Sequence, residues 1–314
     1  MKVILDLDTG IDDGMALSYT VGNKDMELLG VTGTFGNVYT EVGARNALNL
    51  LNILGEPKIP VFMGATHGIT KTEFVRPEIS AQIHGENGVG EIYLPVSKEN
   101  VQEKNGIDFL IESVKKYKNE LFIIATGPLT NLAYALEKAP EILEDLGKIV
   151  IMGGALTVPG NVNAYAEANI SKDPVAAKRV FESGADITMV GLDVTQRSQL
   201  TKEDTRVWKS YGTQAGTAYG EMVDYYISQH THSKGTACYL HDPSAAICAV
   251  HPEYFVQLPM YLTVVTQGES AGRTIGDPAL LREKNPNVKV CVGVHSEQLE
   301  KELKQVLAEV FQRQ

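Results

Sequence analysis

Short apolar runs recur along the chain and alternate with amphipathic stretches. The apolar runs, which we expect to be strands, are KVILDL (2–7), LLGVTG (28–33), IPVFMG (59–64), LFIIAT (121–126), IVIMGG (149–154), ITMVGL (187–192) and YLTVVT (261–266). Four amphipathic stretches, expected to be helices, lie at 43–55, 106–117, 128–140 and 173–184. Strands that are apolar on both faces and alternate with helices are typical of a parallel sheet covered on both sides. The pattern therefore predicts an α/β fold with an open, mainly parallel central sheet.

Two stretches depart from this alternation. Residues 196–240 are polar, helical-looking and rich in Tyr, Ser, Thr and Gln, and we interpret them as a helical cap inserted over the sheet. Residues 297–314 are amphipathic and predict a terminal helix with a solvated charged face. A chain of 314 residues can bury one large core, so we expect a single domain over residues 1–314.

The composition is ordinary for a globular protein, with 43% hydrophobic and 21% charged residues. The formal net charge of -11 argues against nucleic acid or an anionic membrane as a partner, because both attract basic surfaces. Cys238, Cys248 and Cys291 are widely spaced and include no CxxC pair, which disfavours a disulfide framework or a thiolate zinc site. No signal-peptide pattern and no apolar run of membrane-spanning length is seen, so a cytoplasmic location is the expectation.

Polar clusters follow five of the predicted strands at their carboxyl ends. DLDTGIDD follows KVIL, TFGN follows LLGV, ATGPLTN follows LFII, MGGA follows IVI, and GLDVT follows ITMV. Ligands of open parallel sheets bind outside the carboxyl ends of the strands. The clusters therefore predict one site that all five connections build together.

The first cluster puts four aspartates, Asp6, Asp8, Asp12 and Asp13, into eight positions. Side chains alternate along a strand, so Asp6 and Asp8 are expected on one side, while Asp12 and Asp13 fall near the start of a helix. Helix capping explains an acid at a helix N-terminus but does not explain all four. Converging carboxylates favour a hard divalent cation, Ca²⁺ or Mg²⁺. We therefore favour a metal site over capping alone.

Three other motifs gain meaning beside these aspartates. In HDP (241–243), we expect Asp242 to complete a metal shell and His241 to face a substrate, although a histidine in such a tripeptide alone is more often packed or at the surface. The stretch GNVNAYAEAN (160–169) offers hydrogen-bonding groups for a polyhydroxylated ligand, with an ordinary polar loop as the alternative. Gly36-Asn37, after the second strand, predicts only a turn when taken alone.

In their order along the chain, these motifs resemble those of the inosine–uridine-preferring nucleoside hydrolases. The resemblance rests on DLDTGIDD, VTGTFGN, HGENGVG, ATGPLTNLA, MGGA, GN with AEAN, GLDVT and the late HDP, and continues more loosely through GRTIGD and NVKVCVGV. It covers nearly the whole chain. It implies the nucleoside hydrolase fold, which is an open, mainly parallel sheet with a Rossmann-like core, and Ca²⁺ as the cofactor.

The resemblance also implies roles for individual residues. The implied metal ligands are Asp8, Asp13, the backbone carbonyl of Thr126 and Asp242. The implied ribose-binding residues are Asp12, Asn37, Asn161, Glu167, Asn169 and Asp242, with Met152 lining the pocket. Asp6 would orient the cluster from behind, and the protein would be a homodimer or homotetramer.

The implied reaction is hydrolysis of the N-glycosidic bond of a ribonucleoside to ribose and free base, a reaction of nucleoside salvage. Cleavage builds positive charge on the ribose, which nearby carboxylates stabilise. Asp8 is the expected general base toward water, and His241 is the expected acid that protonates the leaving base. Calcium would position the ring hydroxyls, so ribonucleosides should be preferred over deoxyribonucleosides.

Fewer residues bear on the preferred base. His84 is a candidate ligand contact, and Tyr225, Tyr226, Gln229 and Tyr239 are candidates for stacking on or hydrogen bonding to a base, with core packing equally expected for any one of them. Purine-specific relatives use tryptophan stacking, whereas the only tryptophan here, Trp208, lies away from the motifs. We therefore expect a pyrimidine or inosine–uridine preference, with uridine or cytidine favoured.

Two other functions are compatible with part of the sequence. DLDTG is similar to the DxDxT opening of haloacid dehalogenase-type phosphatases, with Asp6 as nucleophile and Asp8 as acid/base. That hypothesis needs a later acidic pair for Mg²⁺, but Gly276-Asp277 lacks the acidic follow-up. A non-catalytic nucleoside or ribose sensor is the second alternative, although binding alone needs neither a base at Asp8 nor an acid at His241.

Overall fold

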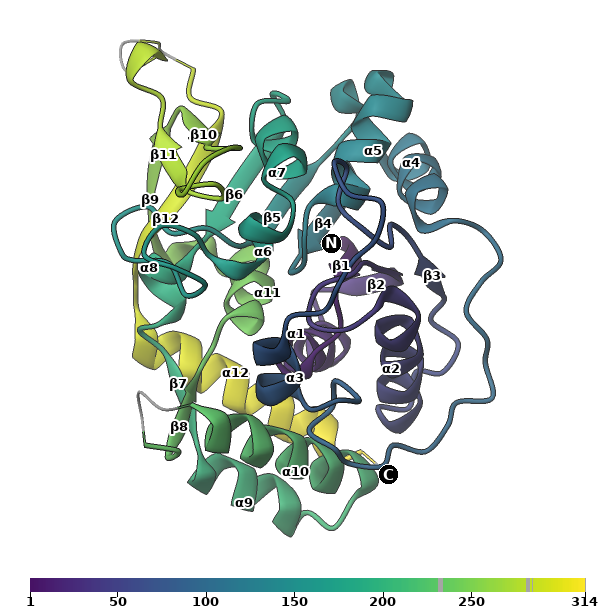
Figure 1. Ribbon diagram of the computed structural model, residues 1–314. Coiled ribbons are helices and arrows are strands. Elements are labelled where there is room, and N and C mark those ends of the chain that lie inside the picture. Colours follow the sequence, from purple (N-terminus) through teal and green to yellow (C-terminus); the bar gives the residue numbers. More distant parts are fainter. Residues whose placement is uncertain (231–233, 281–282, 284, 314) are drawn as a thin grey trace.

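A twisted sheet of eight strands forms the centre of the computed structural model, which describes residues 1–230, 234–280, 283 and 285–313 (Figure 1). The strand order is β3-β2-β1-β4-β5-β6-β12-β9. The bounds are β1 (Lys2–Leu7), β2 (Glu27–Gly33), β3 (Val61–Met63), β4 (Leu121–Ala125), β5 (Lys148–Met152), β6 (Asp186–Val190), β9 (Phe255–Met260) and β12 (Val288–Val294). All neighbours pair in parallel except β9, which runs antiparallel to β12. The predicted open, mainly parallel sheet is confirmed.

Helices cover both faces of this sheet. One core layer holds Val3, Leu5 and Leu7 of β1 together with α1, α2, α11 and α12, and the other holds Ile4 together with α4, α5 and α7. This division follows from the alternation of side chains along a strand. The bounds of the twelve helices among the described residues are α1 (Ile11–Gly22), α2 (Thr40–Ile53), α3 (Glu78–His84), α4 (Gly106–Tyr117), α5 (Thr130–Lys138), α6 (Ala168–Lys172), α7 (Pro174–Phe181), α8 (Leu192–Thr195), α9 (Lys202–Ser210), α10 (Gln214–Gln229), α11 (Asp242–Val250) and α12 (Ser296–Phe311).

The C-terminal third departs from the expected strand set. The run 261–266 does contain a strand, β10 (Leu262–Val264), but it pairs with β11 (Thr274–Gly276) in a separate two-stranded sheet. The central sheet is completed instead by β12 and by the edge strand β9, neither of which was among the expected strands. Pro259 lies in β9, and an edge strand tolerates proline because one side of its backbone is unpaired.

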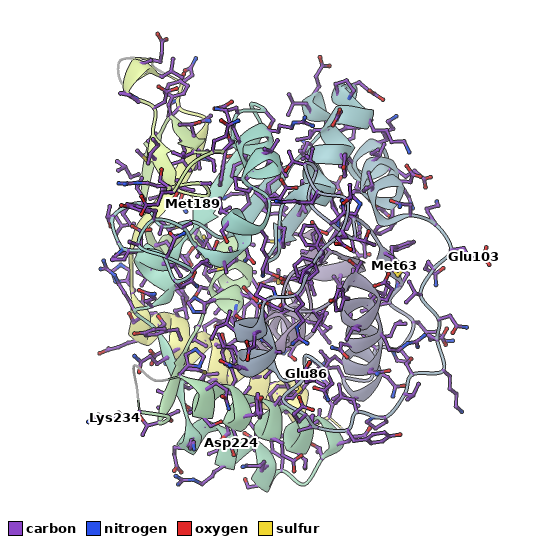
Figure 2. All side chains as sticks on the ribbon, in the orientation of Figure 1. Met63, Glu86, Glu103, Met189, Asp224 and Lys234 are labelled. Carbon is purple, nitrogen blue, oxygen red and sulfur yellow. The ribbon has the colours of Figure 1, made fainter. Side chains whose placement is uncertain are left out.

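Residues 196–240 contain α9, α10 and a small antiparallel sheet of β7 (Gln199–Thr201) and β8 (Ala237–Tyr239); positions 231–233 lie outside the described residues. An ion pair between Lys209 and Asp224, the latter labelled in Figure 2, joins α9 to α10. Trp208 is buried against Phe311 of α12, with ring centroids 5.3 Å apart. The helical character of this stretch is confirmed, whereas its interpretation as a cap within a single domain over residues 1–314 stays a prediction.

The terminal stretch forms α12 over 296–311, as expected, with position 314 outside the described residues. Side chains fill the spaces between the sheet and its helices (Figure 2). Cys238, Cys248 and Cys291 are all buried free thiols. Within the described part of the chain, no helix is both long and apolar enough to span a membrane.

Candidate functional site

The connection from β1 to α1 carries the first group of acids. Asp12 and Asp13 lie in the first turn of α1, as the sequence predicts. The carboxylate of Asp13 accepts hydrogen bonds from the Gly10 N–H at 2.8 Å and from the Thr126 hydroxyl at 2.6 Å. Asp13 therefore does cap the helix, and it also ties the helix to the end of β4.

Asp12, Asp13 and Asp242 form the compact part of the site. One carboxylate oxygen from each of the three lies within 4.8 Å of the other two, and all three side chains are buried. Asp242 reaches them because it is the first residue of α11, which packs against α1. We call Asp8, Asp12, Asp13 and Asp242 the acid cluster.

Electrostatics at the acid cluster favour a cation. Burial raises the pKa of Asp12 to about 6, and the charge of Asp8 adds to the effect. Burial also raises the pKa values of Asp13 and Asp242 well above the usual range, with repulsion from the other acids as the next cause. Within the described residues, Asp12 Oδ1 is buried without a hydrogen-bond partner. A hard cation with oxygen ligands would relieve both the repulsion and the unsatisfied oxygen, so the residues fit a divalent metal.

Asp8 lies just beyond β1 and is held by the connection that follows β2. Its Oδ2 accepts from the Asn37 backbone N–H at 2.7 Å, and its Oδ1 from the Asn37 side-chain amide at 3.2 Å. The same amide lies 3.2 Å from Asp13 Oδ2. A Cβ at Gly36 would collide with Asp8 Oδ2, so this turn needs glycine for the close approach. Asn37 therefore has a structural role at the acid cluster beyond the predicted turn.

Lys172 supplies a positive charge beside these acids. Its Nζ lies 3.1 Å from Asp8 Oδ2, and the lysine side chain is only 10% exposed. Among the described residues, it is the one lysine or arginine that pairs with the acid cluster. Lys172 is not predicted from the sequence, because a lysine in a short helix is usually solvated and nothing local marks this one as buried.

Asp6 lies behind the acid cluster. Its Oδ1 accepts from the Thr32 hydroxyl at 2.6 Å and from the Asn131 amide at 2.7 Å. Burial raises the pKa of Asp6 to about 6. The contacts place Asp6 between β2 and α5, consistent with a supporting position, and they add Asn131 as a partner that the sequence analysis did not single out.

The second wall of the site is built at the start of α6. Glu167 caps this helix, accepting from the N–H groups of Asn169 at 2.9 Å and Ile170 at 3.1 Å, and it also accepts from Gly154 at 3.0 Å. The Asn169 amide donates to the Thr126 carbonyl at 2.7 Å and lies 3.2 Å from the Met152 carbonyl. Asn169 thus joins the ends of β4 and β5 at the predicted carboxyl edge.

Aromatic and histidine side chains lie beside Asp12 at the start of α1. The Tyr226 hydroxyl lies 3.2 Å from Asp12 Oδ2, and the Tyr226 ring is 5.5 Å from His84. Burial lowers the pKa of His84 well below its usual value, followed by the charges of Lys172 and Arg76, and its Nδ1 accepts from the Ile11 N–H at 3.2 Å. His84, the last residue of α3, therefore has a neutral ring that contacts the start of α1.

His241 is the N-cap residue of α11, directly before Asp242. Its Nδ1 lies 2.8 Å from the Thr195 hydroxyl, and its ring is 6.0 Å from Tyr239. The Thr195 contact orients the ring from the end of α8. Tyr239 and His241 therefore lie side by side at the junction of β8 and α11.

Some predicted residues lie farther out. Asn161 is exposed, and its Oδ1 accepts from the N–H of Ala168 at the start of α6. The Tyr225 hydroxyl donates to the Gln82 carbonyl, and the Gln229 amide donates to Ser228. On α10 it is Tyr226, one position from Tyr225, that contacts the acid cluster.

Comparison with known proteins agrees with this arrangement. Residues 3–301 match the model of the inosine-uridine preferring nucleoside hydrolase family. Uridine nucleosidase 1 of Arabidopsis thaliana is 39% identical over 287 residues, covering 91% of this chain and 84% of that protein. The pyrimidine-specific ribonucleoside hydrolase RihA of Citrobacter koseri is 33% identical over 297 residues, covering 94% of both. The solved structure of a purine-preferring ribonucleoside hydrolase from Gardnerella vaginalis aligns with a TM-score of 0.98 and 46% identity, covering 99% of both chains.

The fold, the site and the relatives together define the class of protein: it is a hydrolase that acts on N-glycosyl compounds. The chain belongs to the inosine-uridine preferring nucleoside hydrolase family. Members of this family are metal-dependent, and the aspartates described above could hold the metal. The phosphatase and sensor alternatives are set aside, because the family match spans nearly the whole chain and its relatives are nucleoside-cleaving enzymes.

Proposed function

We propose that this protein is a calcium-dependent ribonucleoside hydrolase that releases ribose and a free base, with a pyrimidine or inosine–uridine preference. The observation that carries the proposal is the buried acid cluster bordered by Tyr226 and His84. It offers carboxylates for a cation and for a sugar, with flat rings for a base beside Asp12. The predicted roles of the individual residues form part of this proposal.

Asp8, Asp13, the Thr126 carbonyl and Asp242 are the proposed calcium ligands. The oxygen-only donor set, the closeness of Asp13 to Asp242 and the raised pKa values of both support this choice. When bound, Ca²⁺ supplies Lewis acidity and a fixed positive charge that orients sugar hydroxyls. Asp12 belongs to the same compact group of carboxylates, so a ribose that Asp12 holds would lie directly beside the cation.

The chain's own residues carry the remaining chemistry. Asp8 accepts the proton of the attacking water, in the orientation that Asn37 imposes on its carboxylate. Asp12, Asn37, Asn161, Glu167, Asn169 and Asp242 are the proposed ribose-binding residues, with Met152 in the pocket wall. Buried carboxylates stabilise the positive charge that develops on the sugar. His241 donates a proton to the departing base.

Base preference has two candidates. The relatives named uridine nucleosidase and pyrimidine-specific hydrolase support uridine or cytidine, as does the position of Trp208 against α12. The 46% identity to a purine-preferring enzyme favours a purine nucleoside as the second candidate. His84, Tyr226 and Tyr239 offer rings that suit either base, so kinetic comparison has to separate the two.

The test is ribose release from uridine, cytidine, inosine and adenosine, with the full chain in Ca²⁺ and in EDTA. We expect Ca²⁺-dependent release with the highest kcat/KM for uridine or cytidine, and little from deoxyuridine. Asp8→Asn should lower kcat by a factor on the order of 10² to 10⁴, while Asp108→Asn, which changes a half-exposed residue of α4, should leave it unchanged. Nucleoside binding without turnover would contradict the proposal, and a kcat/KM that is highest for inosine or adenosine would select the purine candidate.

We also propose a homodimer or homotetramer in the cytoplasm, on the family resemblance. Multi-angle light scattering of the purified chain measures its mass, with one copy at 34.2 kDa as the reference. A single peak at twice or four times that mass is expected.

A further inference from the structure

The ammonium of Lys172 is built into the acid cluster. Its Nζ lies 3.1 Å from Asp8 Oδ2 and 3.5 Å from Asn37 Oδ1. The Asp8 side chain is fully buried, and that of Lys172 is only 10% exposed. Lysine is seldom so buried unless it has a charged partner, because removing an ammonium from water is costly. The ion pair with Asp8 supplies that partner.

The backbone on both sides of Lys172 is fixed in place. Glu167 caps the start of α6, and Lys172 is the last residue of this helix. Asp173 follows and caps α7 through the Ala176 N–H at 3.0 Å, while its other oxygen accepts from the Thr130 hydroxyl and the Ile69 N–H, each at 2.8 Å. The position from which the lysine side chain starts is therefore set by two capped helices, which argues against an incidental surface contact.

Asp8 is at once a member of the acid cluster and the partner of Lys172. A fixed positive charge at this distance repels a divalent cation bound to the same carboxylate, and the repulsion is strong where water is excluded. The same charge offsets the mutual repulsion among the buried acids. Lys172 therefore opposes cation binding while stabilising the fold that holds the acids.

We propose that Lys172 is a built-in counter-charge of the acid cluster that shares Asp8 with the divalent cation and sets how tightly that cation binds. The inference rests on the proposed metal site. A lysine that only orients Asp8 would have the opposite signature, because its loss would misplace a ligand and weaken cation binding. The direction of the change in affinity thus separates the two roles.

The experiment is calorimetric titration of the chelator-treated full chain with Ca²⁺, for the wild type and three variants. Lys172→Met, which keeps the chain length but removes the charge, should bind Ca²⁺ at least about tenfold more tightly, a change of about 1.4 kcal/mol. Lys172→Arg keeps the charge and should stay within about threefold of the wild type. Lys178→Met removes a half-exposed lysine of α7 that pairs with Glu182, away from the acid cluster, and should leave the affinity unchanged.

Thermal unfolding in EDTA provides a second readout that needs no activity. Lys172→Met should melt several degrees below the wild type because Asp8 loses its partner, and saturating Ca²⁺ should remove the difference. Lys172→Gln, shorter and polar, serves if the methionine variant does not fold. Uridine hydrolysis by the wild type, with unchanged or weaker Ca²⁺ binding by Lys172→Met and Lys172→Gln, would overturn the Lys172 proposal alone. If neither the wild type nor any variant bound Ca²⁺, both the Lys172 proposal and the proposed calcium site would be overturned.

Discussion

The hydroxyl of Tyr226 and the carboxylate of Asp12 lie 3.2 Å apart, although 214 residues separate them in the sequence. The contact joins α10 to the first turn of α1, and it brings the stretch 196–240 into the acid cluster. Burial and the neighbouring charge of Asp12 raise the pKa of Tyr226 well above its usual range, so the hydroxyl keeps its proton and donates to Asp12. Tyr226 therefore orients a carboxylate that is proposed to hold the ribose.

Replacing Tyr226 by Phe should weaken substrate use without unfolding the protein. The change removes one hydrogen bond to a charged group and keeps the ring against His84. A bond of this kind contributes about 1.5 to 3 kcal/mol, so kcat/KM for uridine should fall roughly tenfold or more. Tyr93→Phe is the control, since the Tyr93 side chain is 85% exposed and has no proposed role at the site. Equal losses in both variants would contradict a specific role for Tyr226.

The contrast between Tyr225 and Tyr226 shows where prediction from sequence stops. Strand ends could be predicted because an apolar run has a clear end, and parallel strands bring their carboxyl ends to one edge. For that reason Asp12 and Asp13 were expected at this edge, whereas Asn169 and Asp242 were expected beside them from the motifs GNVNAYAEAN and HDP and from the family resemblance. Adjacent residues on a helix point about 100° apart, so contact by Tyr226 rather than Tyr225 depends on the rotation of α10 about its axis. Local sequence does not determine that rotation.

The limits of strand prediction have a similar cause. The run 261–266 is as apolar as the central strands, but its partner is decided by the chain around it, and β10 pairs outside the central sheet. β12 was not among the expected strands, and it pairs in parallel with β6 all the same. Lys172 escaped notice for a related reason, since its burial depends on Asp8, which is 164 residues away.

Asp6 should matter to stability through its hydrogen bonds more than through its charge. Asp6→Ala leaves the Thr32 hydroxyl and the Asn131 amide without their acceptor, and we expect the free energy of unfolding to fall by about 2 to 4 kcal/mol. Asp6→Asn keeps an acceptor oxygen and removes a buried charge, so its cost should stay below about 1 kcal/mol. Urea denaturation of both variants in EDTA measures the difference. A larger loss in the asparagine variant would show that the charge itself is needed.

His241 should be dispensable when the leaving group needs no proton. Loss of a general acid typically costs a factor on the order of 10² or more, so His241→Ala should lower kcat for uridine by at least that much. With p-nitrophenyl riboside, whose leaving group departs as a stable anion, the same variant should keep most of its activity. Thr195→Val removes the hydroxyl that orients the His241 ring. It should also lower kcat for uridine more than kcat for p-nitrophenyl riboside, by a smaller factor than His241→Ala. Equal losses on both substrates would assign His241 to binding.

Stability should change with pH in opposite directions with and without calcium. Burial raises the pKa values of Asp6 and Asp12 to about 6, whereas an aspartate in the unfolded chain titrates at about 4. In EDTA the folded protein therefore holds protons that the unfolded chain has lost, and stability present below about pH 4 declines as pH rises through about 6, by up to about 1.4 kcal/mol per pH unit for each group. Bound Ca²⁺ needs ionised ligands, so the stabilisation of the fold by saturating Ca²⁺ should grow over the same pH range.

Urea midpoints at pH 4.5, 5.5 and 6.5 measure both trends, and Asp12→Asn should flatten the decline in EDTA. A wild-type midpoint in EDTA that rises across this range would refute the assignment of raised pKa values to these buried acids.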